Sequence, residues 1–110
     1  MGWVAGSELC TAVTNAGGLG MIALPRLPAP ALGTVLGKLA QACDGPFGVN
    51  SLVPFLDDGA LEVAAERGPV VGFFYSDPGP VLVERARPAN GAVAGWFGRG
   101  SPCCRRRRWR

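Results

Sequence analysis

The chain has 110 residues, the length of one small domain, and 48% of them are hydrophobic, which is enough to build a core. Residues 1–98 carry a net charge of −3, and the +6 of residues 99–110 comes entirely from arginine, so the charge gives no support to nucleic-acid binding by the whole domain. The 17 glycines and 10 prolines lie mostly between apolar runs, as in the turns of a compact domain.

The cysteines and the hydropathy pattern predict the compartment. No pair among Cys10, Cys43, Cys103 and Cys104 has C-x-x-C spacing and the chain has no histidine, so a zinc site is not indicated. No apolar run reaches the roughly 18 residues of a membrane span. The opening lacks a basic segment and has Glu8 early, unlike a signal peptide. We therefore expect reduced thiols in a cytoplasmic protein that does not enter a membrane.

The first unit is a helix followed closely by a strand. Residues 7–16 read as a helix with Ser7 as its N-cap. Its expected apolar face has the i, i+3, i+4, i+7 spacing and consists of Leu9, Ala12, Val13 and Ala16. Gly17 and Gly18 supply the left-handed exit that a helix C-terminus prefers, and residues 19–24 read as a buried strand.

The second unit follows a connector stiffened by Pro25, Pro28 and Pro30. Residues 31–43 read as a helix that ends at Asp44-Gly45-Pro46, and residues 47–53 as the next strand. The apolar face expected for this helix consists of Leu32, Val35, Leu36, Leu39 and Ala40.

Two further units complete the pattern. Asp57 and Asp58 can cap a helix over residues 59–67, which precedes a buried strand over 70–75. Asp77, which a proline follows, is expected to cap a short helix over 79–87. A last strand is expected over 92–96.

This strand–helix alternation, at about 25 residues per unit, indicates an α/β fold with a parallel sheet covered by helices. A doubly wound sheet and a (β/α) barrel both fit. The glycines of Gly17-Gly18-Leu19-Gly20 follow a helix and precede a strand, whereas a dinucleotide fingerprint needs the opposite order and a different spacing. A classical nicotinamide site or a P-loop is therefore not predicted.

Two segments could hold a ligand. Asn50 is expected to end a strand, and in a barrel the carboxyl ends of the strands line the active-site mouth. Its amide could bond a planar ligand edge or a phosphate, or could satisfy its own loop backbone. Glycines in the turn over residues 1–6 would let backbone N–H groups approach a flat ligand or phosphate, with Trp3 over a ring, although the residues by themselves favour a simple apolar loop.

Composition changes abruptly near residue 97, which divides the chain into a domain over 1–97 and a basic, disordered tail over 98–110. The arginines of the tail are a solvated end, or else a nuclear-import or polyanion-binding patch. Because no linker eases the change, we also hypothesise a reading-frame change or a truncated gene model, which sequencing the locus would test.

Three motifs, in order and at similar spacing, resemble the nitronate monooxygenase (2-nitropropane dioxygenase) family: Met1-Gly2-Trp3-Val4-Ala5, the segment over 15–22, and Pro46-Phe47-Gly48-Val49-Asn50. The segment over 70–74 resembles the family's next strand, so the resemblance extends over residues 1–96. FMN-dependent enoyl-acyl-carrier-protein reductases share the fold and much of the first two motifs. Val53-Pro54-Phe55-Leu56-Asp57 favours the monooxygenases.

The resemblance implies a partial (β/α)8 TIM barrel of about four parallel strands that binds FMN and oxidises alkyl nitronates with molecular oxygen. It places Met1, Gly2, Trp3 and Asn50 at the flavin. It implies no metal, and no residue of this chain is assigned a catalytic role. The partners expected are a small-molecule nitronate and oxygen, with nucleic acid limited to nonspecific contact by the arginine tail.

The departures from the family are substantial. Family members have a strand before the Met-Gly-Trp turn, a catalytic histidine in the second half, and a glutamine where this chain has Phe97. We therefore expect an inactive part of a barrel that is poorly folded, aggregation-prone or dependent on association. The enoyl-reductase type of flavoenzyme and a non-catalytic fragment with a polyanion-binding tail stay open as alternatives, as does the oligomeric state.

Overall fold

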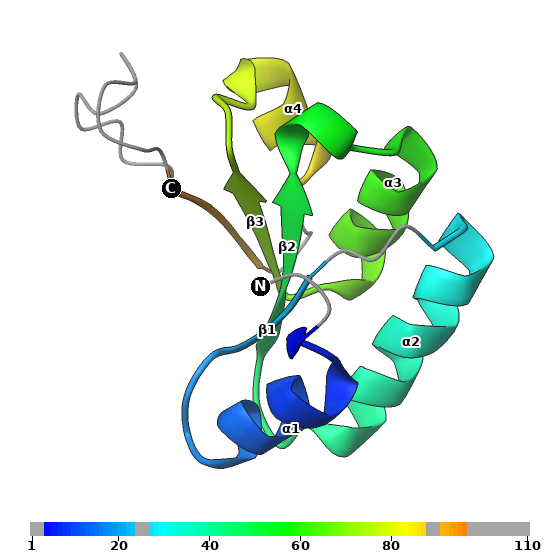
Figure 1. Ribbon diagram of the computed structural model, residues 1–110, viewed down its shortest axis with the longest axis vertical. Helices are drawn as coiled ribbons and strands as arrows, with labels where there is room; N and C mark the ends of the chain where they lie inside the picture. Colours follow the sequence, from blue (N-terminus) through cyan, green and yellow to red (C-terminus); the bar gives the residue numbers. More distant parts are fainter. Residues whose placement is uncertain (1–3, 24–26, 88–90, 97–110) are drawn as a thin grey trace.

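A computed structural model describes residues 4–23, 27–87 and 91–96. Parallel strands alternate with helices to give a partial (β/α)8 barrel, as predicted (Figure 1). The elements are α1 (Ser7–Asn15), β1 (Gly20–Ala23), α2 (Ala29–Ala42), β2 (Phe47–Leu52), the 3-10 turn η2 (Val53–Phe55), α3 (Asp58–Arg67), β3 (Val70–Phe74), α4 (Gly79–Arg85) and β4 (Ala92–Trp96). The strand order is β1-β2-β3-β4, so each helical crossover adds the next strand to the same edge.

The helices gather on one side of the sheet, and the core lies between the two layers (Figure 1). Alternate strand residues point into this core, among them Val49, Val71 and Phe73, each at most 1% exposed. The helical side of the core consists mainly of Leu32, Leu36 and Leu39 of α2 and Leu61 and Ala64 of α3. The predicted apolar face of α2 is thus confirmed for its leucines.

The predicted apolar face of α1 is wrong. Leu9 and Val13 are 49% and 39% exposed, whereas Cys10 and Thr14 face the sheet. The reason is the close approach of α1 to β1. The backbone N–H of Gly20 donates to Thr14 Oγ1 (3.1 Å), and a Cβ at Gly20 would overlap the Cys10 carbonyl oxygen. Only small side chains fit at such a distance, so the larger apolar ones face outward.

Three predicted helix starts differ in detail. Ser7 is the first residue of α1 and not its N-cap, which is Gly6 without a side-chain bond. Pro30 lies in the first turn of α2 and not in the connector, because a proline there loses no helical hydrogen bond. Asp77 does not cap α4, whose N-cap is Pro78. The Asp77 carboxylate instead accepts from the Gly79 N–H (2.9 Å) and closes a local turn.

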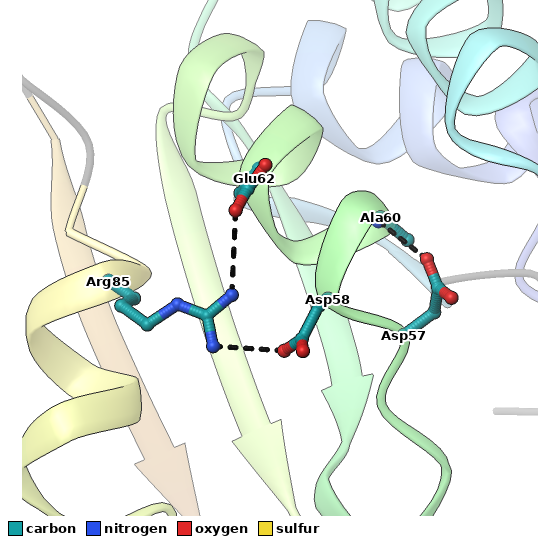
Figure 2. A network of polar contacts seen from close by, with 5 residues as sticks. All are labelled: Asp57, Asp58, Ala60, Glu62 and Arg85. Atoms are coloured by element: carbon teal, nitrogen blue, oxygen red, sulfur yellow. Dashed lines mark hydrogen bonds and ion pairs between the residues drawn. The ribbon is translucent and has the colours of Figure 1, made fainter.

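The exit of α1 and the start of α3 follow the sequence. Gly17 has φ +91°, the left-handed exit expected after α1. Asp57 Oδ1 accepts from the Ala60 N–H (2.8 Å) as the N-cap of α3, while Asp58 lies inside the helix and meets Arg85 of α4 (Figure 2). The two adjacent carboxylates therefore have different structural roles.

Candidate functional site

The face of the sheet that points away from the helices, called here the open face, carries a row of small residues. The strand register aligns Ala23, Asn50, Gly72 and Ala94 across β1 to β4. Asn50 is the single member of this row with a polar side chain. In a closed barrel this face lines the interior, and its upper rows border the mouth where barrel enzymes bind their ligands.

The neighbours of Asn50 in this row have little or no side chain. A Cβ on Gly72 would lie 3.3 Å from Asn50 Oδ1 and 3.3 Å from Met21 Cε, tighter than ordinary contact. One row below, the Met21 sulfur occupies the place that a Cβ on Gly48 would take. The Met21 side chain therefore lies over Gly48 and reaches Gly72, where it borders the Asn50 amide. We call Ala23, Asn50, Gly72 and Ala94, with Met21 below them, the Asn50 shelf.

The amide of Asn50 is half-buried and makes no hydrogen bond with another described residue. The alternative that it satisfies its own loop backbone is therefore not seen in the described part of the chain. One expectation about it is wrong: β2 does not end at Asn50 but continues to Leu52, because Leu52 pairs with Phe74 of β3. Asn50 thus lies one row inside the mouth.

The other predicted site residues, Met1, Gly2 and Trp3, lie outside the described residues, as does the tail over 98–110.

The loop after β3 carries a feature that the sequence did not indicate. Tyr75 follows directly on β3 with φ 73°, the one described non-glycine residue with a left-handed backbone, and is 70% exposed. Such backbone strain concentrates at ligand sites. The Tyr75 ring packs 4.4 Å from that of Phe74, centroid to centroid. A tyrosine was expected inside the strand, and neither periodicity nor turn propensity distinguishes it there.

No ionisable side chain lies in the four aligned positions of the shelf. The described carboxylates lie on helices and turns, for example Asp58 and Glu62, which contact the Arg85 guanidinium at 2.9 Å and 3.6 Å on the outer surface (Figure 2). No group of three or more histidine, cysteine or acidic residues among residues 4–23, 27–87 and 91–96 could hold a metal ion. The shelf can therefore position a planar ligand through shape and one amide, but supplies no proton-transfer group of its own.

Comparison with known proteins places the chain in a family. Residues 1–70 match the family described as nitronate monooxygenase. Over 94 residues, 84% of this chain and 26% of the relative, it is 36% identical to (3aS,4S,5R,7aS)-5-hydroxy-7a-methyl-1-oxo-octahydro-1H-indene-4-carboxyl-CoA dehydrogenase of Mycobacterium tuberculosis. The enzyme of the same name from Rhodococcus jostii is 44% identical over 50 residues, 46% of this chain and 14% of that enzyme. The chain thus spans about a quarter or less of these relatives.

Solved structures share the fold. FabK from Thermotoga maritima superposes with a TM-score of 0.69 at 30% identity, over 86% of this chain and 31% of FabK. Nitroalkane oxidase from Streptomyces ansochromogenes superposes with a TM-score of 0.72 over 86% of this chain and 37% of the oxidase. Its identity of 23% supports the fold alone. Among the described residues no helix is both long and apolar enough to cross a membrane.

Proposed function

Because the chain belongs to the nitronate monooxygenase family, a family of oxidoreductases, we propose that it forms the flavin-holding part of an FMN-dependent enzyme that oxidises alkyl nitronates with molecular oxygen. The observation that carries this proposal is the Asn50 shelf, where an amide without a hydrogen bond to another described residue lies in a row whose other members are alanine and glycine. Met1, Gly2 and Trp3 are proposed to complete the flavin site from the N-terminal turn, and residues 98–110 to lie outside the domain.

The described residues fit a planar ring system with a polar edge. Gly72 adds no side chain of its own, so a bound ring would meet the Met21 methyl group and the Asn50 amide there, and that amide can both donate to and accept from a ring edge. Met21 would offer the ring a polarisable apolar surface.

When bound, FMN would supply the redox chemistry, taking electrons from the nitronate and passing them to oxygen. The residues of this chain would act by position. Asn50 would fix the rotation of the ring in its plane, and Met21 and the small residues would exclude water from the face turned toward the sheet. The 110 residues contain no histidine, so we assign no proton-abstracting base within them.

The test is a titration with FMN, followed by the change in flavin fluorescence. Asn50→Ala should weaken binding about tenfold, the equivalent of one lost hydrogen bond of about 1.4 kcal/mol, and Gly72→Val should weaken it further by filling the shelf. Gln41→Ala, on the exposed surface of α2, is the matched control and should bind as the unaltered chain does. Equal FMN affinity in the Asn50 variant and the control would contradict the proposed site.

A second candidate is a dehydrogenase that acts on a coenzyme A thioester. It is favoured by the 36% identity to the M. tuberculosis enzyme, which extends over 84% of this chain. The two candidates share the shelf and differ in the substrate. In the flavin-loaded protein that contains this chain, oxygen consumption dependent on propyl-2-nitronate supports the monooxygenase. Reduction of the flavin by a coenzyme A thioester without nitronate turnover supports the dehydrogenase.

A further inference from the structure

The joint between α1 and the end of α2 holds a cysteine at its centre. Asn15 of α1 donates from Nδ2 to the Ala42 carbonyl (3.0 Å) and accepts at Oδ1 from the Asp44 N–H (2.8 Å). These two bonds fix the backbone on both sides of Cys43, the residue between them, which caps the C-terminus of α2. The backbone at Cys43 cannot move away from α1 without breaking these two bonds.

The Cys43 thiol points toward α1 and meets the turn that carries a second cysteine. Cys43 Sγ lies 3.8 Å from Thr11 Oγ1, and the preceding residue in α1 is Cys10. Cys10 is 1% exposed and belongs to the core cluster, and Cys43 is half-buried against the same cluster. Burial, followed by the neighbouring Cys43 side chain, raises the pKa of the Cys10 thiol above its usual value, partly offset by a hydrogen bond with Thr14. The two cysteines therefore lie at one helix–helix joint, with the Cys43 side chain close enough to act on the Cys10 thiol.

We propose that Cys10 and Cys43 are an oxidisable thiol pair that closes to a disulfide under a hydroperoxide and joins α1 to the α2–β2 turn. The more exposed Cys43 attacks the peroxide, its sulfur is oxidised to a sulfenic acid, and one water leaves. The Cys10 sulfur then attacks that sulfenic sulfur, the S–S bond forms, and a second water carries away the oxygen. In total, two thiols and one hydrogen peroxide give one disulfide and two waters.

The order of the two roles follows from burial. A hydroperoxide can reach half-buried Cys43 but not Cys10, which is 1% exposed, so Cys43 is oxidised first and Cys10 then attacks the sulfenic sulfur. The bond would link α1, whose contact with β1 depends on small side chains, to the turn that leads into β2, the strand that carries Asn50. Closure would thus stabilise the lower end of the sheet without touching the Asn50 shelf. Oxidation of this thiol pair does not depend on the proposed function.

The experiment uses the full chain with Cys103→Ser and Cys104→Ser, so that only this pair can react. The folded protein is treated with hydrogen peroxide, free thiols are blocked with N-ethylmaleimide, and the protein is digested with trypsin. We expect mass spectrometry to find the peptide over residues 1–26 linked to the peptide over 39–67, and dithiothreitol to release them. The thermal midpoint should rise by about 5–15 °C on closure.

Three controls make the outcome decisive. Asn15→Ala, which removes the clamp but neither thiol, should slow closure severalfold, whereas Thr34→Ala on the exposed side of α2 should not. In urea the difference between these two variants should vanish. Cys43 oxidised beyond sulfenic acid while Cys10 stays free, a link between two chains in place of one within a chain, or unchanged thiols would each overturn the proposal.

Discussion

Asn50 is the one residue with a polar side chain in its row of the open face. Its neighbours in the row, Ala23, Gly72 and Ala94, offer no hydrogen-bonding side chain, and the amide stays unpaired among the described residues. Its amide atoms are not among the buried polar atoms that lack a partner in the described residues, so water can reach them. A polar ligand edge could take the place of that water, because the amide can both donate and accept.

Ser51, the residue after Asn50, lies on the helix-covered face of the sheet and allows a test of whether its buried hydroxyl is hydrogen-bonded. Ser51 is fully buried against the helices, and its Oγ has no hydrogen-bond partner among the described residues. Ser51→Ala should therefore leave the free energy of unfolding unchanged or raise it by up to about 1 kcal/mol, because the variant removes a desolvated hydroxyl and little volume. Urea unfolding measures the effect, with exposed Ser76→Ala as control. A loss above about 1 kcal/mol would mean that the hydroxyl is bonded after all.

At the scale of elements, what could be predicted depended on which contact decides each feature. The leucines of α2 belong to the core cluster between the helices and the sheet, so the 3.6-residue period identified them correctly. On α1 the deciding contact is the close approach of the helix to the backbone of Gly20. The spacing of apolar residues does not indicate such a contact, so the predicted face is wrong. Asn50 could be found because a polar residue in an apolar strand is visible in the sequence. The shelf around it could not, because it arises from the register of four strands.

Tyr75 was missed for a different reason. Its apolar neighbours made the strand appear one residue longer, whereas the left-handed backbone that ends β3 is set by the loop that follows. Local propensity favours a tyrosine inside a strand. The tertiary structure overrides that propensity at the mouth of the partial barrel, where strain and exposed aromatic surface occur together.

The start of α3 provides a comparison of two adjacent carboxylates (Figure 2). Asp57 caps the helix by accepting from the Ala60 N–H, and its replacement by alanine should lower the free energy of unfolding by about 1 kcal/mol. Asp58→Ala removes the 2.9 Å contact with Arg85 instead. Because the Asp58 side chain is 76% exposed, that variant should cost less than about 0.5 kcal/mol and less still in 0.5 M salt. Equal losses in denaturant titrations would contradict this assignment.

For the whole molecule, the distribution of apolar surface is uneven. The helices cover one face of the sheet, and the described chain provides no layer over the other. Within the described residues, β1 and β4 each pair on one side alone, so both outer edges present unpaired backbone groups. Leu9, Val13 and Leu19 add an apolar stripe on the outside of α1 and the loop after it, each between 39% and 49% exposed. A closed barrel would bury both the edges and the open face.

Because the sheet edges, the open face and the apolar stripe are exposed, we expect the isolated chain to form oligomers. Sedimentation velocity should give species heavier than the 11.4 kDa monomer, with the proportion rising with concentration. Replacing Leu9 and Val13 together by glutamine should lower that proportion by removing part of the stripe. Val81→Gln, at an equally apolar and 70% exposed position on α4, tests whether any loss of surface hydrophobicity has the same effect. If the stripe is the contact, the α4 variant sediments as the unaltered chain does. A monomer at all concentrations with one cooperative thermal transition would instead show that four strands and their helices are stable without a further layer.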